Sequence, residues 1–427
     1  MPVRLDDLAQ GRLSGRPVGI TSVCSAHPVV LRAALRFGRE TGATVLIEAT
    51  CNQVNHQGGY TGMTPADFVA MVEGLAAQED CPMTQVLLGG DHLGPNPWRH
   101  LPAEQALAEA ETMMQAYVAA GFRKVHLDAS MGCRGEPAAL DDHATAARAA
   151  HLSAVAEACA AQMDAPLPRY IIGTEVPPPG GADHILDTVP PTDPAAARET
   201  IAVHREVFEM AGLEQAFSRV LGVVVQPGVE FGNHNVIRYD SASAQSLCRV
   251  LDNEPALIFE AHSTDYQGTA PLAQLVCDGF PILKVGPELT FVLREALYAL
   301  DLIASDLIPG YGERPLMQAM EALMLQAPDN WDRHYSGTPE EQHLLRHYSL
   351  SDRIRYYWTA PQAQAAVNRL TEALRGQHLP LPLIWQHLPG ADHFAGRPLI
   401  PEDVLIWRVT RSLASYHAAC FPDPKGA

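Results

Sequence analysis

Short apolar segments recur along the chain between residues 18 and 286, and each ends in polar or ionisable residues. They are Val18–Val23, Val45–Ala49, Val86–Gly89, Lys124–Asp128, Tyr170–Gly173, Leu221–Val225, Ala256–Glu260 and Ile282–Val285. Segments that are largely apolar throughout are typical of strands buried on both faces, as in a parallel sheet. Eight such strands with helical stretches between them predict an α/β fold, a closed (β/α)₈ barrel. In that fold the catalytic groups lie at the C-terminal ends of the strands.

The stretches between the predicted strands carry helix signals. Thr64-Pro65 offers an N-cap and a proline at the first helical position, and the apolar residues that follow recur at helical spacing. Further helical patterns cover residues 102–120, 140–161, 194–211 and 287–304.

No further strand–helix repeat follows Ile308. Residues 308–427 are rich in aromatic, histidine and proline residues and contain helical stretches such as Pro361–Leu374. We therefore predict a barrel over residues 1–307 and a helical extension over residues 308–427 that packs on it. The Pro177–Gly181 loop can continue neither a helix nor a strand, which is typical of a lid or binding segment.

Composition limits the class of protein. The chain has 427 residues and a net charge of -19, which disfavours nucleic acid and anionic membranes as partners. High solubility alone would also explain this charge. Eight scattered cysteines without CxxC pairs, no signal-peptide pattern and no apolar run of ~20 residues indicate a cytoplasmic protein without a membrane span.

Three histidines follow predicted strands and could meet above the barrel. His92 comes after Asp91 beyond the third strand, His234 lies beyond the sixth, and His262 directly follows the seventh. A single histidine among 18 is more often a surface or core residue. Three at strand ends favour a metal centre, because imidazole nitrogens suit zinc and similar divalent ions.

Other polar residues near the strand ends are candidates for the same site. Asp128 and Glu175 end neighbouring strands and could act as base, ligand or orienting group. Glu48 and His126 lie within strands, where alternation leaves open whether each points into the barrel or outward. Asn52 and Gln53 begin a polar loop that could bind a polyol or could simply be solvated.

Arg353 and Arg355 stand two residues apart beside aromatic residues. Such a pair could clamp a phosphate group, and a buried structural pair would have the same sequence.

Longer segments resemble a known family. They are Glu48–Met63, Gly89–Trp98, Lys124–Met131, Gly173–Pro177 and Ser351–Trp358, and they resemble the GatZ/KbaZ family, which is linked to tagatose-bisphosphate aldolase. That family in turn resembles the class II ketose-bisphosphate aldolases, which are zinc-dependent (β/α)₈ barrels.

The resemblance implies roles for individual residues. Asp91 would be an acid/base, and His92, His234 and His262 would bind the metal. The segment around His234 lacks one residue that the aldolases have between Asn and His. After His262 this chain has Ser263–Gly268 where the aldolases have a Gly-Gly-Ser-Gly phosphate loop, a departure that argues against bisphosphate aldolase activity.

The remaining candidates divide into two groups. Glu175 would be a second acid/base, and substrate binding is assigned to Glu48, Asn52, Gln53, His126, Asp128, Ser263, Arg353 and Arg355. We expect a divalent metal, with zinc as the first choice and manganese, cobalt or nickel as alternatives.

Three different functions are associated with this family: a kinase, a 4-epimerase and a non-catalytic subunit. Kinase activity is disfavoured because the chain has no Gly-Lys dipeptide and hence no P-loop. We predict a metal-dependent 4-epimerase that converts D-tagatose 6-phosphate to D-fructose 6-phosphate by retro-aldol and aldol steps in tagatose and galactitol catabolism. A non-catalytic subunit that stabilises class II D-tagatose-1,6-bisphosphate aldolase is the alternative. The expected partners are a sugar phosphate, that aldolase's catalytic subunit and further copies of this chain.

Overall fold

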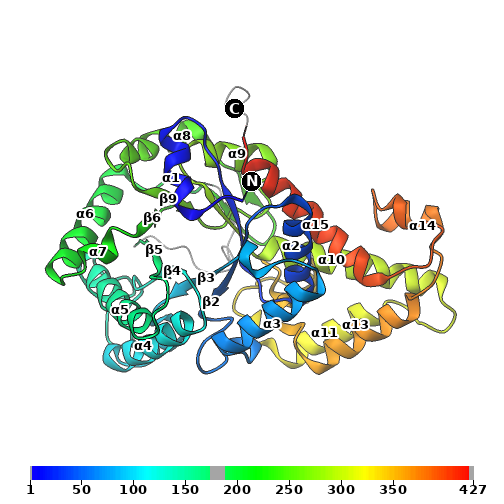
Figure 1. Ribbon diagram of the computed structural model, residues 1–427. Helices are drawn as coiled ribbons and strands as arrows, with labels where there is room; N and C mark the ends of the chain where they lie inside the picture. The colour runs from blue at the N-terminus through cyan, green and yellow to red at the C-terminus, as the bar shows by residue number, and fades with distance from the viewer. Residues whose placement is uncertain (1, 174–187, 423–427) are drawn as a thin grey trace.

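The computed structural model describes residues 2–173 and 188–422, and a closed barrel of parallel strands lies at its centre (Figure 1). The order around the barrel is β1-β10-β9-β6-β5-β4-β3-β2. The barrel strands are β1 (Ile20–Val23), β2 (Val45–Thr50), β3 (Val86–Leu93), β4 (Lys124–Leu127), β5 (Arg169–Ile172), β6 (Val220–Val224), β9 (Ile258–Ala261) and β10 (Ile282–Val285). The eight predicted strands and the barrel are therefore confirmed.

Helices surround the barrel and extend beyond it (Figure 1). They are α1 (Leu5–Leu13), α2 (Pro28–Thr41), α3 (Pro65–Gln78), α4 (Ala103–Ala119), α5 (Asp142–Gln162), α6 (Pro194–Met210), α7 (Glu214–Phe217), α8 (Ser241–Cys248), α9 (Thr269–Cys277), α10 (Pro287–Leu307), α11 (Pro315–Gln326), α12 (Pro339–Tyr348), α13 (Pro361–Leu374), α14 (Leu381–His387) and α15 (Pro401–Ala419). The predicted signals explain their starts: the Thr64 side chain caps α3 by accepting from the backbone N–H of Asp67. None of the described helices is long and apolar enough to cross a membrane.

Apolar side chains fill the barrel interior at the end where the strands begin, and we call this cluster the apolar plug. Ile20, Leu46, Ile258 and Ile282 point into it from four strands, and Leu8 of α1 packs against the same cluster. Helix α1 therefore closes the end of the barrel at which the strands begin. Burial of this kind is the main favourable contribution to folding, at ~25 cal/mol per Å² of apolar surface.

A short hairpin interrupts the strand–helix repeat after β6. Its strands β7 (Glu230–Phe231) and β8 (Val236–Ile237) pair antiparallel and form a sheet separate from the barrel. The hairpin carries residues 232–235 as its turn. This detour between the sixth strand and α8 is not visible in the pattern of apolar positions.

The last helix returns from the extension to the barrel. Helix α15 contacts α2, α9, α10 and β1, whereas α11 to α14 lie to one side, next to α10 (Figure 1). The backbone N–H of Gly19 donates to the carbonyl of Cys420 over 2.7 Å, which ties the end of this helix to the first strand. The division at residues 307 and 308 stays a prediction, and α15 belongs by its contacts to the ring of helices around the barrel.

Candidate active site

A cavity of about 650 Å³ opens at the end of the barrel where the strands finish. Asp91, His92 and His262 line it, together with Ser263 and Lys284. These residues come from the ends of β3, β9 and β10, so the cavity lies where catalytic groups of this fold are found. Its size is that of a site for a small molecule.

A bulge at the end of β3 positions the Asp91-His92 pair. The strand continues to Leu93, and its register against β4 shifts between Gly90 and Leu93. His92 has a φ of 52°, a left-handed conformation that is uncommon outside glycine. Bulges redirect side chains and are frequent beside active sites. Here the bulge allows two consecutive residues, Asp91 and His92, both to line the cavity.

Two Asp–His pairs link the ends of strands β3 and β4. Nδ1 of His126 on β4 lies 2.9 Å from Oδ1 of Asp91 on β3, and Nδ1 of His92 on β3 lies 2.8 Å from Oδ2 of Asp128, just beyond β4. All four side chains are buried. Each carboxylate therefore fixes the orientation of an imidazole on the neighbouring strand, an arrangement common around metal-binding histidines.

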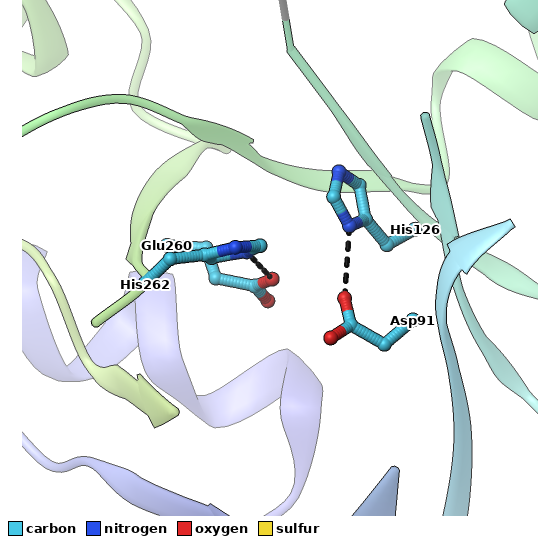
Figure 2. A group of neighbouring side chains, drawn as sticks. All are labelled: Asp91, His126, Glu260 and His262. Atoms are coloured by element: carbon cyan, nitrogen blue, oxygen red, sulfur yellow. Dashed lines mark hydrogen bonds and ion pairs between the residues drawn. The ribbon is translucent and has the colours of Figure 1, made fainter. Parts of the chain in front are cut away.

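Three imidazoles meet beside the cavity: His92 and His262 line it, and His126 is fully buried against both. The ring centroids of His92, His126 and His262 are 5.0, 5.1 and 5.2 Å apart. Asp91, His126, Glu260 and His262 each offer one ligand atom, and these atoms lie within 4.8 Å of one another. Figure 2 shows these four side chains pointing toward a common space, with Asp91 and His126 on one side and Glu260 and His262 on the other.

The structure does not bring His234 to this group. It is exposed on the turn between β7 and β8. Ser349 and Ser351 of the extension donate to Oδ1 of the adjacent Asn233 over 2.7 and 3.0 Å, which holds the turn against the extension. The imidazole that lies beside His92 and His262 is that of His126, whereas His234 was the residue predicted to meet them.

Two lysines and two glutamates form a charged layer beneath the imidazoles. Nζ of Lys124 lies 2.8 Å from Oε1 of Glu48 and 2.7 Å from Oε2 of Glu260. Nζ of Lys284 lies 3.4 Å from each of these carboxylates and also pairs with Asp91. The sequence has only three lysines, and the two in the described residues both lie here.

Sequence reasoning missed Lys124, Lys284 and Glu260. The available signal was an ionisable residue inside a short, otherwise apolar strand, where burial without a partner is too costly to persist. Glu48, which was expected to bind substrate, is fully buried in this layer, and Ser22 donates to its Oε1 over 2.7 Å. Its contacts are those of a structural charge.

Mutual interactions keep these groups charged. Burial opposes ionisation of Asp91, but His92 and Lys284 outweigh it and hold the pKa of Asp91 well below its usual value. Burial likewise opposes ionisation of Asp128, while His92 brings the pKa of Asp128 down to about 2. Burial opposes the charge of Lys284, but Asp91, Glu48 and Glu260 hold its pKa well above the ordinary lysine value.

The balance of charge suits a divalent cation. Four buried carboxylates face two buried ammonium groups: Glu48, Asp91, Asp128 and Glu260 against Lys124 and Lys284. Burial, reinforced by Lys284, lowers the pKa of His262 to about 3, so this imidazole is neutral and able to bind a metal. Nε2 of His126 is buried and has no hydrogen-bond partner among the described residues. Imidazole and carboxylate together are ligands that zinc takes in catalytic sites.

The other predicted binding residues divide into two groups. Asn52, Gln53, Ser263 and Arg355 line the cavity. Arg353 is not among the residues that line the cavity. Its Nη1 donates to the carbonyl of Asn330 over 2.9 Å, and its guanidinium carbon lies 5.8 Å from the ring centroid of Tyr356.

Two predicted features cannot be placed. Glu175 and the Pro177–Gly181 loop lie outside the described residues.

Comparisons with known proteins cover almost the whole chain. Residues 5–421 match the family described as "D-tagatose-1,6-bisphosphate aldolase subunit GatZ/KbaZ-like". A protein from Agrobacterium fabrum named D-tagatose 6-phosphate 4-epimerase is 61% identical over 419 residues, which are 98% of this chain and 99% of that protein. A crystal structure of a probable tagatose 6 phosphate kinase from Sinorhizobium meliloti 1021 is 53% identical with a TM-score of 0.86, covering 94% of this chain and 100% of that one.

Loss of one ammonium group from the charged layer should destabilise the fold in a pH-dependent way. Lys284→Met removes the ammonium group that pairs with Asp91 and Glu260. Removing one partner of a buried ion pair should lower the free energy of unfolding by ~3–5 kcal/mol near pH 8. The carboxylates of the variant regain a higher pKa and take up protons in the folded state as the pH falls. The difference in unfolding free energy from the unaltered protein should therefore shrink toward pH 5.

Urea unfolding at pH 8 and pH 5 measures this effect. Arg205→Met is the matched control, because it removes a cation from the exposed pair with Glu254 and should cost less than ~1 kcal/mol. Equal losses in the two variants, or a Lys284→Met loss that does not depend on pH, would contradict the assignment.

Proposed function

Because this chain belongs to the GatZ/KbaZ-like family of D-tagatose-1,6-bisphosphate aldolase subunits, we propose that it is itself an enzyme, a D-tagatose 6-phosphate 4-epimerase. The observation that carries the proposal is the 61% identity over nearly the full length of both chains to a protein of that name. The cavity supports it, since a buried, charged Asp91 and three imidazoles are chemical machinery that a purely structural subunit does not need.

The chemistry at C4 dictates the route. C4 of the ketose is not adjacent to the C2 carbonyl, so its hydrogen is a poor acid. Cleavage of the C3–C4 bond needs only the loss of the C4 hydroxyl proton, and a carboxylate within hydrogen-bond reach can take it. The bonding electrons stay on C3, and glyceraldehyde 3-phosphate forms from C4 to C6. Rotation of this aldehyde and re-addition to its other face inverts C4.

Asp91 is the proposed base. It lines the cavity, and it is held charged between Lys284 on one side and His126 on the other. A fixed, ionised carboxylate at the cavity floor can accept the C4 hydroxyl proton and return it after re-addition. Glu175 remains the predicted second acid/base.

We propose that His92, His126 and His262 hold a divalent ion, zinc first among the candidates, with Glu260 beside them. A bound ion would supply Lewis-acid polarisation of the substrate oxygens. Asp128 orients His92 for this task through the 2.8 Å contact with Nδ1. The ammonium groups of Lys124 and Lys284 offset part of the carboxylate charge below.

The phosphate of the substrate would bind at the rim, near Arg355. This guanidinium lines the cavity and is stacked on Tyr356, with 4.4 Å from its central carbon to the ring centroid. Nη2 donates to the Tyr356 hydroxyl over 2.8 Å, which fixes its direction. Asn52 and Gln53 on the same cavity wall offer amide groups to the sugar hydroxyls.

A non-catalytic subunit is the second candidate, and the family description favours it. Such a subunit would bind a class II tagatose-bisphosphate aldolase and need no turnover of its own. That partner and self-association of this chain stay predictions. Kinase activity is not proposed, because the chain lacks a P-loop.

The purified chain alone should interconvert the two ketose 6-phosphates, and a chelator should stop it. Asp91→Asn should lower kcat by about 10²- to 10⁴-fold, the usual loss on removing a general base. His126→Ala should abolish metal retention and turnover, whereas His234→Ala should retain both. A coupled fructose 6-phosphate assay and metal analysis of each variant measure these effects.

The His126 and His234 variants form a matched pair, since each removes one imidazole. Loss of metal in His234→Ala with retention in His126→Ala would reverse our ligand assignment. An inactive, metal-loaded chain that prolongs the half-life of an added tagatose-bisphosphate aldolase would establish the subunit role instead.

Isotope exchange separates carbon–carbon cleavage from proton abstraction. The C4 hydrogen never leaves its carbon in the proposed route, so the product formed in heavy water should carry no deuterium at C4. NMR of the purified product measures this. Free dihydroxyacetone in small amounts would fit with cleavage, and deuterium at C4 would refute it.

The two neighbouring arginines should differ sharply. Arg355→Ala removes charge-assisted hydrogen bonds to the phosphate, each worth ~1.5–3 kcal/mol, so kcat/KM should fall by about 10- to 100-fold, mainly through KM. Arg353→Ala, whose guanidinium points toward Asn330, should leave KM within about 3-fold. Steady-state kinetics with tagatose 6-phosphate decide this, and equal effects of the two substitutions would remove Arg355 from the phosphate site.

A further inference from the structure

The C-terminal extension holds a second convergent group of metal-ligand side chains, and none of its members lines the cavity. Glu321 lies on α11, and His343 and His347 lie on α12. Each of the three offers one ligand atom, and these atoms lie within 4.8 Å of one another. The two histidines are four residues apart, so they project from the same face of their helix.

Both imidazoles direct a nitrogen at the same carboxylate. Nδ1 of His343 lies 3.0 Å from Oε1 of Glu321, and Nε2 of His347 lies 3.1 Å from Oε2. The centroids of the two rings are 4.9 Å apart. Two nitrogens and a carboxylate thus surround one small space between α11 and α12.

The surroundings of His347 are those of a metal-binding histidine. Its side chain is fully buried, and Nε2 makes no well-formed hydrogen bond within the described residues despite its closeness to Glu321. Its other nitrogen, Nδ1, lies 2.6 Å from the hydroxyl of Tyr298. A histidine that is held through one nitrogen and aimed with the other is the usual arrangement around bound metals.

Arg346 orients the carboxylate. Its Nε donates to Oε2 of Glu321 over 2.8 Å, and its guanidinium lies over the ring of Trp331, 4.7 Å from the centroid. The carboxylate is therefore fixed in direction and shared among Arg346, His343 and His347. A carboxylate oxygen can accept from arginine and bind a cation with its remaining lone pair.

We propose that Glu321, His343 and His347 bind a zinc-like divalent ion that joins α11 to α12. Two imidazoles and one carboxylate form a ligand set that zinc accepts, with water in the fourth position. The His343 side chain is 44% exposed, so solvent and ion can reach the site. This site is separate from the proposed catalytic metal and does not depend on the proposed function.

The position of the site gives the ion a structural role. Ser349 and Ser351, which hold Asn233 of the β7–β8 turn, follow α12 directly, and Arg355 comes soon after. An ion between α11 and α12 would restrain the start of this segment. Zinc should therefore stabilise the folded chain, because a ligand that binds only the native state raises its stability.

Zinc binding by the full chain tests the proposal in a background of His126→Ala with His262→Ala, which removes two of the three histidines proposed for the catalytic metal. After dialysis against zinc, this background should retain about one ion per chain, and zinc should raise its thermal midpoint. Adding His343→Ala should remove both effects. Adding His151→Ala is the matched control and should preserve both, because His151 forms an exposed pair with Glu111 over 2.7 Å and belongs to neither of the two groups of possible metal ligands among the described residues.

Retention of zinc after His343→Ala, or its loss after His151→Ala, would overturn the proposal. Crystals of the unaltered chain soaked in zinc give a test that does not depend on variants. An anomalous peak should lie within ~2.0–2.2 Å of nitrogens of His343 and His347 and an oxygen of Glu321. Absence of that peak while the catalytic cavity is loaded would also overturn it.

Discussion

Two buried ammonium groups inside the barrel hold the candidate site together. Lys124 and Lys284 lie between the carboxylates of Glu48, Glu260 and Asp91, all buried. Removing such charges from water is expensive, and only complete pairing makes it tolerable. Packing around them is accordingly tight: a Cβ on Gly89 would lie 2.8 Å from Cγ of Glu48. This layer separates the apolar plug below from the chemical groups above, and it keeps Asp91 ionised.

The groups above that layer are organised by two neighbouring strands. The bulge in β3 lets Asp91 and His92 both line the cavity, and the reciprocal pairs with His126 and Asp128 lock both imidazoles. His262 completes the triangle from the opposite side of the barrel. The extension contributes at the rim, where Arg355 lines the cavity and Asn233 is held by two serines. Rigid strands thus carry the proposed reacting groups, and the extension carries the proposed phosphate contact.

The family and two of its relatives carry names that imply different functions: an aldolase subunit, a 4-epimerase and a kinase. Retro-aldol chemistry connects the first two, because cleavage of C3–C4 is shared by an aldolase and by an epimerase that re-adds the aldehyde. The buried carboxylate of Asp91, the imidazoles beside it and the cavity-lining Arg355 suit that shared step. Phosphoryl transfer from a nucleotide would need a phosphate cradle of a different kind.

The sequence alone determined the barrel, since short, largely apolar strand segments are a local pattern that recurs eight times along the chain. It also placed Asp91, His92 and His262 at one end, because parallel strands finish on the same side. Only the tertiary structure decided the rest. His126 points inward although alternation allowed either direction, and His234 is carried away by a hairpin. Arg355 lines the cavity and Arg353 does not, although both belong to the same 3₁₀ turn, η6 (Arg353–Tyr357). Glu260 pairs with both Lys124 and Lys284, and these two lysines are 160 positions apart in the chain. No local sequence pattern encodes such a contact.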